Sequence, residues 1–334
     1  MGWFKKDPLQ IIAFQGYGTN SHFYARGRAL EDESINLDQQ NLWQVMLNTW
    51  KRFETDEVKH VAIHITLPDA TVLKGKTDNH GYYRIEANLQ NLAALSNEEG
   101  WLSFELSYDD AVIKNYIQNN NKFAGKILIP ASNAAYGVIS DIDDTILHTG
   151  VISKLKWRVI VNSFFKHATA RIPLEGAAYF YHKLHKGALG TDTNPIFYVS
   201  HSPWNLYRYL ELFLRQNDFP NGPILLRSMK HIFRKKSVDT QPQKQKEIYN
   251  LLKTYPNLPF ILIGDSGEHD PDIYMEIASA FPDRILAIYL RSVKHKKKML
   301  RVRSLLEHFK TTEVVMAETS AQAIEHAKQH GFIA

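Results

Sequence analysis

Apolar and polar residues alternate in short stretches along the first part of the chain, and this period of two predicts strands with one buried face. One helical stretch, Asn41–Phe53, interrupts them, and Gly16, Tyr17 and Gly18 are predicted to form the turn between the first two strands. Many short strands joined by turns are typical of a β-sandwich, so we expect a mainly β accessory domain here. The predicted strands are 11–14, 22–28, His60–Leu67, Thr71–Thr77, Tyr82–Ala87, Trp101–Tyr108 and Lys126–Ile129.

Strands and helices alternate in the second part of the chain, which is the pattern of a parallel sheet covered by helices on both faces. We expect a doubly wound α/β domain at 133–334, with a small helical insert at about 151–172, after a sandwich-like domain at 1–132. The short segment Pro130–Asn133 marks the boundary. The predicted strands are Tyr136–Ser140, Pro195–Ser200, Pro259–Gly264, Arg284–Leu290 and Glu313–Met316. The predicted helices are Gly176–His185, Trp204–Gln216 and Ala321–His330, the last with Ser320 as its N-cap.

The composition of the 334 residues is that of a globular protein, since 44% are hydrophobic and 22% are charged. The absence of cysteine excludes disulfide frameworks, thiolate metal sites and cysteine nucleophiles. No stretch approaches the roughly 20 apolar residues that a transmembrane helix needs. The N-terminal segment, with early charges and Pro8, is unlike a secretory signal. We therefore expect a cytoplasmic protein.

Charge is divided unevenly between the two parts of the chain. Residues 1–135 contain 13 Lys and Arg against 16 Asp and Glu, whereas residues 136–334 contain 27 against 19. The basic balance of the second part indicates an anionic partner, and nucleic acid, anionic lipid and small phosphate esters all satisfy it. An ordinary solvated basic surface is the competing interpretation.

Three carboxylates stand directly after the predicted strand Tyr136–Ser140, in the segment Asp141-Ile-Asp143-Asp144-Thr145. Like charges crowded together resist ionisation, and a divalent cation offsets their repulsion. A helix–loop–helix calcium site requires Gly at loop position 6 and Glu at position 12. This chain has Ile146 and Ile152 there, so that class of site is excluded. A solvated acidic turn is the remaining alternative to a metal-binding cluster.

Two further carboxylates, Asp265 and Asp270, follow the predicted strand Pro259–Gly264. Between the two acidic clusters, Ser200 ends a strand and Lys244 stands just ahead of a predicted helix. A hydroxyl donor and a lysine charge suit a phosphoryl group, and Mg²⁺ is commonly held by carboxylates together with phosphate. Taken singly, Ser200 is more typical of a helix cap and Lys244 of a solvated lysine. Because ligands bind at the carboxyl ends of strands in open α/β sheets, we expect these residues to meet at one edge.

Taken together and in this order, these segments resemble the motifs of the haloacid dehalogenase (HAD-like) phosphatase superfamily. Its motifs are DxDxT/V, a Ser or Thr, a Lys and an acidic pair. They correspond here to Asp141-x-Asp143-x-Thr145, Ser200, Lys244 and Gly264-Asp265…Asp270. Three segments look like one branch of this superfamily, the catalytic domain of the actin-patch-type phosphatidate phosphatases. They are Ser-Asp-Ile-Asp-Asp-Thr-Ile-Leu, Phe-Tyr-Val-Ser-His-Ser-Pro-Trp-Asn-Leu-Tyr and Ile-Gly-Asp-Ser-Gly-Glu-His-Asp-Pro-Asp-Ile-Tyr. The resemblance covers roughly residues 136–330.

The resemblance implies a two-step phosphatase mechanism. Asp141 would attack phosphorus and form an aspartyl phosphate, and Asp143 would act first as general acid and then as general base. The implied Mg²⁺ ligands are Asp141, Asp143 through its backbone carbonyl, Asp265 and Asp270, with orientation of Lys244 as an alternative role for Asp270. The implied phosphate-binding residues are Thr145, Ser200 and Lys244, with Ser202 and Lys246 as rivals for the last two.

We therefore expect a Mg²⁺-dependent phosphatidate phosphatase that hydrolyses phosphatidate to diacylglycerol and phosphate. The same chemistry on a soluble or nucleic-acid phosphomonoester is one alternative, and a non-enzymatic membrane adaptor is another. The basic segments Arg227–Lys236 and Lys294–Arg303 contain one Phe, Tyr or Trp between them, Phe233, and show no aromatic interleaving that suggests base stacking, so nucleic acid is not expected as a partner.

The expected partner is an anionic phospholipid, contacted peripherally at a membrane surface, and the sequence does not identify any protein partner. In the insert, Lys154–His167 places Trp157 and Phe164 on an apolar arc opposite basic residues. This pattern fits either a membrane interface or packing against the rest of the protein.

Overall fold

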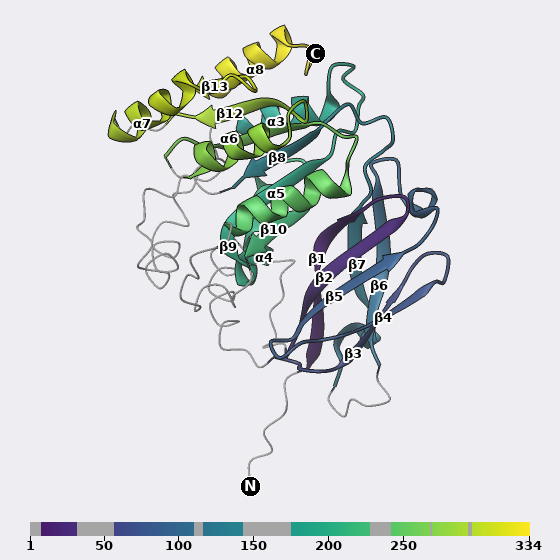
Figure 1. The fold of residues 1–334 in the computed structure, drawn as a ribbon. Helices are drawn as coiled ribbons and strands as arrows, with labels where there is room; N and C mark the ends of the chain where they lie inside the picture. The colour runs from purple at the N-terminus through teal and green to yellow at the C-terminus, as the bar shows by residue number, and fades with distance from the viewer. Residues whose placement is uncertain are drawn as a thin grey trace. The chain divides into compact units, whose positions relative to one another are not determined.

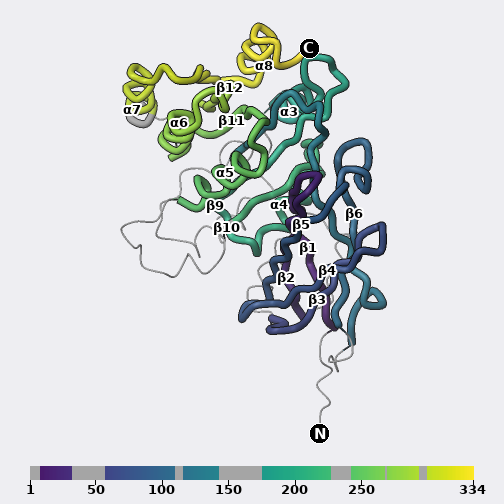
Figure 2. The backbone as a smooth tube through the Cα atoms, turned by 45° about the vertical axis from the view of Figure 1, so that its right-hand side comes forward, coloured from purple at the N-terminus to yellow at the C-terminus, as the bar shows by residue number. Residues whose placement is uncertain are grey.

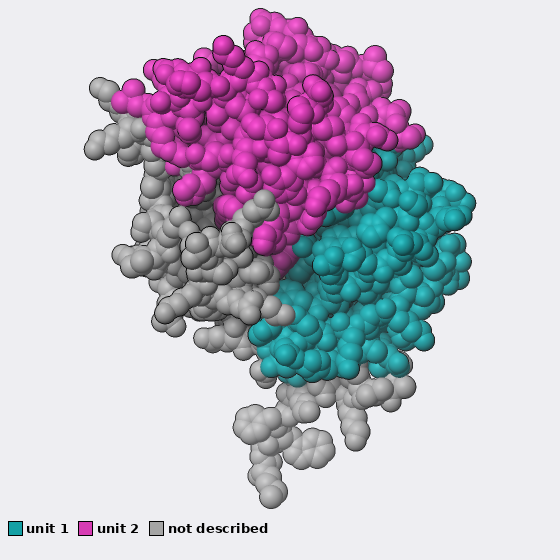
Figure 3. Space-filling model, in the orientation of Figure 1, with its two compact units in different colours: residues 1–131 teal, residues 132–334 magenta. Residues whose placement is uncertain are grey.

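The computed structural model describes residues 8–31, 57–109, 116–142, 175–227, 242–267, 269–292 and 296–334. They belong to two compact units, which we call the β unit (1–131) and the α/β unit (132–334) and which Figure 3 colours separately. The predicted helix Asn41–Phe53 and the predicted insert at 151–172, with its amphipathic segment Lys154–His167, lie outside the described residues.

A seven-stranded sheet forms the β unit (Figure 1). Its strands are β1 (Leu9–Gly18), β2 (His22–Glu31), β3 (Ala62–Thr66), β4 (Val72–Lys76), β5 (Tyr82–Asn88), β6 (Trp101–Tyr108) and β7 (Phe123–Leu128). Their order is β4-β3-β6-β7-β1-β2-β5, and all pairs are antiparallel except β1 with β7. Strands β4 and β5, at the two ends of this order, lie side by side. The predicted mainly β domain is therefore present, but it is one nearly closed sheet and not a sandwich of two.

The alternation of apolar residues explains why one curled sheet suffices. In β3, Ile63 and Ile65 are buried, whereas the residues that alternate with them, Ala62, His64 and Thr66, are only half-buried. A sheet with one apolar face can bury that face by closing on itself, without a second sheet. The core side chains include Phe23, Ile63, Ile65, Leu102, Leu106 and Ile127.

The segment Gly16–Gly18 belongs to β1 and is not the predicted turn. Strand β1 continues to Gly18, and the chain turns at Thr19–Ser21. A Cβ atom on Gly16 would lie 2.4 Å from the carbonyl oxygen of Tyr24 on β2. Glycine is therefore used here for the close approach of two strands, a role that local sequence does not distinguish from a turn.

A parallel sheet and helices alternate in the described part of the α/β unit, as predicted. The strands are β8 (Gly137–Asp141), β9 (Ile196–Pro203), β10 (Ile224–Arg227), β11 (Phe260–Asp265), β12 (Ile285–Arg291) and β13 (Val314–Ala317). The helices are α3 (Ala177–Lys186), α4 (Tyr207–Gln216), α5 (Gln243–Thr254), α6 (Asp270–Ala280), α7 (Lys296–Glu307) and α8 (Ser320–Gln329). Within the described residues, no helix has the length and apolar character that crossing a bilayer requires.

The order of the strands creates a switch point in the middle of this sheet. The order is β10-β9-β8-β11-β12-β13, and every pairing is parallel. The chain moves outward from β8 to β10 on one side, then returns to β11 and moves outward on the other. In open α/β sheets, ligands bind where such an order reverses, which here is at the carboxyl ends of β8 and β11.

Helices lie on both faces of the sheet. Helix α3 packs against α8, and α5 packs against α6. In Figure 1, α5 and α6 lie in front of the sheet and α3 lies behind it. The turned view of Figure 2 shows α8 next to the C-terminal end of the chain.

Helix α8 begins with a cap that differs from the predicted one. The N-cap is Thr319, whose side chain accepts a hydrogen bond from the backbone N–H of Gln322, while the Gln322 side chain accepts one from the backbone N–H of Thr319. This reciprocal capping box requires Gln or Glu three residues after the cap, and Gln322 meets that requirement for Thr319. Ser320 instead donates a hydrogen bond to the carbonyl oxygen of Glu175 at 2.8 Å.

Candidate active site

Asp141 and Asp265 are the last residues of the two strands that flank the switch point. Asp141 ends β8 and Asp265 ends β11. The two strands pair in parallel as far as Ser140 and Ile263, so both aspartates leave the sheet at the same edge. Both are fully buried. Buried carboxylates need hydrogen bonds or opposite charges, so their partners define the site.

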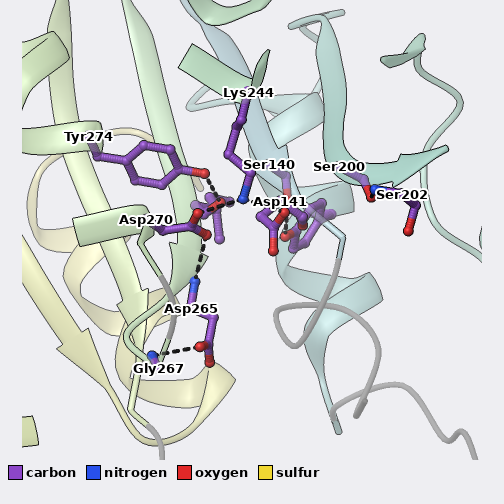
Figure 4. Close-up of polar contacts among 11 residues, drawn as sticks. Ser140, Asp141, Ser200, Ser202, Lys244, Asp265, Gly267, Asp270 and Tyr274 are labelled. Carbon is purple, nitrogen blue, oxygen red and sulfur yellow. Dashed lines mark hydrogen bonds and ion pairs between the residues drawn. The ribbon is translucent and has the colours of Figure 1, made fainter. Parts of the chain in front are cut away.

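Lys244 supplies the opposite charge. It lies in the first turn of α5, and its Nζ atom is 2.6 Å from Oδ1 of Asp141 and 2.5 Å from Oδ1 of Asp270 (Figure 4). Its side chain has no exposed surface. Lys246 is half-buried, and two residues of helix turn it by about 200° from Lys244. The structure therefore brings Lys244 to the acidic cluster, and not its rival Lys246.

Asp270 connects Lys244 to β11. It is the first residue of α6, and its Oδ1 accepts the hydrogen bond from Lys244. Its other oxygen, Oδ2, accepts a hydrogen bond from the backbone N–H of Asp265 at 3.2 Å. Because each carboxylate oxygen already has a donor, this geometry favours the orienting role of Asp270 over direct metal ligation.

Gly264 leaves room for the carboxylate of Asp270. A Cβ atom at this position would lie 2.6 Å from Oδ2 of Asp270 and 2.7 Å from Cε2 of Tyr274. Both distances are shorter than ordinary contacts between these atoms. A residue with a side chain at Gly264 would therefore displace Asp270 or Tyr274.

The ion pairs set the protonation state of Lys244. Burial by itself would lower its pKa, because an ammonium group loses its hydration. The carboxylates of Asp141 and Asp270 outweigh burial and hold the pKa of Lys244 well above its usual range. Lys244 is therefore charged at physiological pH. The described residues of the site include three buried carboxylates, two of which contact the one ammonium, so negative charge is in excess there.

Hydroxyl groups hold the backbone beneath the carboxylates. The Oγ atom of Ser140 donates to the carbonyl oxygen of Asp141 at 2.7 Å and lies 2.5 Å from the hydroxyl of Tyr181. The hydroxyl of Tyr274 donates to the carbonyl oxygen of Ile263 at 3.0 Å. Burial raises the pKa of both tyrosines well above the usual range, so both keep their protons. Sequence reasoning did not single out these residues, because a buried Tyr or Ser in a strand or helix carries no local signal of its role.

Ser200 lies on the opposite side of β8 from Asp265. Strands β8 and β9 pair as far as Asp141 and Val199, so Ser200 comes one residue beyond the last pair at the same edge. Its Oγ atom accepts a hydrogen bond from the backbone N–H of Ser202 at 2.9 Å (Figure 4). Both serines are buried. The structure thus places both candidate hydroxyls near the switch point and does not choose between them.

Several predicted site residues lie outside the described residues. They include Asp143, Asp144 and Thr145 of the first motif. Residues 228–241, which hold most of the basic segment Arg227–Lys236, and residues 293–295, at the start of Lys294–Arg303, also lie outside.

The described carboxylates suit a hard divalent cation such as Mg²⁺. Asp141 and Asp265 offer oxygen atoms from the ends of adjacent strands, and the cluster has the excess negative charge noted above. Oδ1 of Asp265 accepts a hydrogen bond from the backbone N–H of Gly267 at 2.6 Å, which fixes the orientation of that carboxylate. Oxygen ligands in a preset orientation are the kind that Mg²⁺ prefers.

Comparisons with known proteins relate this chain to one enzyme family, whose match lies in the α/β unit. The family described as "Phosphatidate phosphatase APP1, catalytic domain" matches residues 136–292. The chain is 34% identical over 224 residues to Phosphatidate phosphatase APP1 of Saccharomyces cerevisiae, an alignment that covers 67% of this chain and 35% of that protein. It is 28% identical over 204 residues to an uncharacterized protein of Schizosaccharomyces pombe, covering 55% of this chain and 32% of that protein. The chain therefore spans about a third of the length of these curated relatives.

Proposed function

Because residues 136–292 belong to the family of phosphatidate phosphatase APP1 catalytic domains, we propose that this protein is a Mg²⁺-dependent phosphatidate phosphatase. It hydrolyses phosphatidate to diacylglycerol and phosphate. The observation that carries the proposal is the buried chain of ion pairs from Asp141 through Lys244 to Asp270, within the segment that matches the family. These ion pairs hold a carboxylate and a counter-charge together at the edge where an α/β sheet binds its ligands.

Asp141 is the proposed nucleophile. A carboxylate must be ionised to attack phosphorus, and Lys244 at 2.6 Å favours the ionised form. An oxygen atom of Asp141 forms a bond to phosphorus while the bond between phosphorus and the glycerol oxygen breaks. Diacylglycerol leaves with a proton from Asp143. Water then gives a proton to Asp143 and attacks the aspartyl phosphate, which releases phosphate and restores Asp141.

Lys244, Ser200 and Thr145 are proposed to hold the phosphate oxygens, since phosphoryl transfer depends mainly on positioning and charge. Asp270 keeps the ammonium of Lys244 in place through the 2.5 Å contact and acts as a positioning residue. Asp141, Asp265 and the backbone carbonyl of Asp143 would hold Mg²⁺, which would supply the additional positive charge that the transferring group requires.

We also assign the α/β unit to the HAD-like superfamily. The support is the parallel order β10-β9-β8-β11-β12-β13, with Asp141 at the end of the central strand β8 and Asp265 at the end of its neighbour β11. Among the described motif residues, Asp141 ends β8, Ser200 lies in β9 and Lys244 in the first turn of α5, while Asp265 ends β11 and Asp270 begins α6.

The proposed substrate is an anionic phospholipid, so we place the protein in the cytoplasm, in peripheral contact with membranes. The amphipathic segment Lys154–His167 is the proposed contact, on sequence grounds alone. Replacing Lys156→Glu and Arg158→Glu together is expected to reduce vesicle binding and phosphatidate hydrolysis severalfold, and to spare a soluble aryl phosphate. Loss of both activities together with thermal stability would contradict this role.

Phosphate release by the purified full chain tests the proposed function. The substrates are phosphatidate in vesicles, a nucleotide and a 3′-phosphorylated oligonucleotide, each with Mg²⁺ and with a chelator. We expect Mg²⁺-dependent release from phosphatidate and far slower release from the other two. Faster hydrolysis of a soluble substrate would overturn the lipid assignment, and release unaffected by chelation would overturn the metal dependence.

A further inference from the structure

Two histidines and one glutamate meet where α8 ends and β13 begins. His326 lies in the last turn of α8 and His330 is its C-cap, so the two residues are four positions apart and share one helix face. Glu313 stands directly before β13. One nitrogen or oxygen atom from each of the three side chains lies within 4.8 Å of the others.

This cluster is separate from the acidic site. Asp141 and Asp265 are the last residues of their strands, whereas Glu313 comes just before the first residue of β13. All strands of the sheet are parallel, so the cluster and the acidic site lie at opposite edges. Nothing in the proposed reaction uses Glu313, His326 or His330.

Both imidazole rings direct Nε2 toward the carboxylate of Glu313. Nε2 of His326 lies 3.0 Å from Oε1, and Nε2 of His330 lies 2.9 Å from Oε2. The two rings stack with their centroids 4.0 Å apart. A single ion between the rings and the carboxylate would therefore contact all three side chains.

The tautomer of His330 follows from its other nitrogen. Nδ1 of His330 lies 2.9 Å from the carbonyl oxygen of His326, which can only accept a hydrogen bond, so Nδ1 carries the hydrogen. In the neutral ring, Nε2 then presents a lone pair to Oε2 of Glu313. Two acceptors that face each other at this distance repel, and a positive group between them removes the repulsion.

The hydroxyl of Tyr289 contacts the ring of His326, the second histidine of the cluster. Tyr289 lies on β12, where it pairs with Val315 of β13, and its hydroxyl is 2.9 Å from Nδ1 of His326. A tyrosine hydroxyl can accept a hydrogen bond from Nδ1 of His326, and the lone pair of that ring is then on Nε2. Histidines that bind metal commonly donate their other ring nitrogen to such a group.

One divalent ion between the stacked rings and the carboxylate would contact Nε2 of both histidines and neutralise the charge of Glu313.

We propose that Glu313, His326 and His330 form a binding site for Zn²⁺ or a chemically similar late first-row ion. Two imidazole nitrogens and one carboxylate oxygen suit these ions, whereas Mg²⁺ and Ca²⁺ prefer oxygen ligands throughout. Histidines four residues apart on a helix are a known spacing of zinc ligands. Three protein ligands leave the fourth tetrahedral position to water.

The expected role of this site is structural. The ion would tie the end of α8 to the start of β13. The residues that follow α8 take part in the packing of the same unit, since the carbonyl oxygen of Phe332 accepts a hydrogen bond from the hydroxyl of Tyr136 at 2.7 Å. Because an ion that binds the folded state stabilises it, Zn²⁺ is expected to raise the melting temperature.

Zinc titration of the full chain tests the site. The protein is first stripped with a chelator and then titrated calorimetrically with Zn²⁺ in the presence of excess Mg²⁺, which occupies the acidic site. We expect the wild type to bind one equivalent of Zn²⁺ with a rise of several degrees in melting temperature. His330→Gln and Glu313→Gln are both expected to lose that equivalent and that rise. Co²⁺ in place of Zn²⁺ should give the visible absorbance of a tetrahedral site in the wild type only.

His182→Gln is the matched control. His182 lies 3.5 Å from the carboxylate of Asp218, and this pair is not part of any group of three metal-binding side chains among the described residues. The control should keep the Zn²⁺ equivalent. His330 and Glu313 are partly exposed, at 39% and 50%, so their variants should fold, and their metal-free melting temperatures check this. No stoichiometric binding by the wild type, or binding retained in both variants, would overturn the proposal.

Discussion

The ammonium nitrogen of Lys244 lies 2.6 Å from Oδ1 of Asp141, although Asp141 ends strand β8 and Lys244 lies in the first turn of helix α5, much later in the chain. Both side chains are removed from solvent. Each is stable there because of the other, since an isolated buried charge loses its hydration without compensation. The fold and the proposed chemistry therefore depend on the same contact.

Replacing Lys244→Met is expected to damage both stability and activity. The substitution leaves Asp141 and Asp270 without their shared counter-charge, and removal of one partner from a buried ion pair typically costs about 3–5 kcal/mol of unfolding free energy. Loss of a charge that stabilises the transition state lowers kcat by about 10²-fold or more. Urea unfolding and phosphate release measure the two effects. Lys246→Met is the matched control on the same helix, and equal losses in the two variants would contradict the role of Lys244.

Asp141→Asn is expected to abolish phosphate release while the protein still folds, because Lys244 keeps its ion pair with Asp270. An amide oxygen does not attack phosphorus at a useful rate, so the covalent step is lost. Circular dichroism and thermal melting verify folding, and turnover is measured with saturating Mg²⁺. Asp272→Asn is the control, since Asp272 forms an exposed ion pair with Arg301 away from the buried cluster. Retention of a tenth of wild-type activity by Asp141→Asn would show that another group is the nucleophile.

Gly264→Ala tests the placement of Asp270. The added methyl group would lie 2.6 Å from Oδ2 of Asp270, so the carboxylate must move and Lys244 with it. We expect a fall in kcat on the order of 10²-fold, because small displacements of catalytic groups have large effects. Overpacking is also expected to lower the unfolding free energy by about 1–3 kcal/mol.

Gly137→Ala separates these two effects of Gly264→Ala. Its methyl group would lie 2.5 Å from the ring of Phe260, at the opposite end of β8 from Asp141. This variant should lose stability but keep its activity per folded molecule. A similar loss of kcat in both variants would mean that the effect of Gly264→Ala is not specific to Asp270.

The stability of the protein is expected to fall as the pH rises above about 10. Burial raises the pKa of Tyr181, Tyr198 and Tyr274, so the folded state keeps protons that the unfolded chain releases near pH 10. Each raised pKa therefore contributes stability that is complete below the unfolded pKa and is lost as the pH rises toward the folded one.

Unfolding free energies measured from about pH 8 to about pH 11, a range that includes the tyrosine midpoint near 10, test this dependence. Tyr198→Phe removes one such group together with its hydrogen bond to the carbonyl oxygen of Pro220. The stability difference between wild type and this variant should narrow above about pH 10. Tyr116→Phe, at an exposed position, should leave the curve unchanged. Parallel curves for wild type and Tyr198→Phe would contradict the assignment.

The elements that carry the acidic residues could be predicted because their signals are local. Apolar residues run along β8 and β11 up to the point where Asp141 and Asp265 follow, and a run of this kind bounded by charge is recognisable in a single sequence. The alternation in β3 is equally local. Since the carboxyl ends of parallel strands share one edge, the meeting of the two acidic motifs followed from the same pattern.

Contacts between distant elements were decided by the tertiary structure. The choice of Lys244 over Lys246 depends on how α5 is rotated against the sheet, and spacing along the chain does not report that rotation. The closing of the β sheet depends on β4 meeting β5, and the cluster of Glu313 with His326 and His330 depends on α8 returning to β13. Hydrophobic periodicity shows which side of an element is buried. It does not show which element covers that side, because that choice is made by packing among residues far apart in the chain.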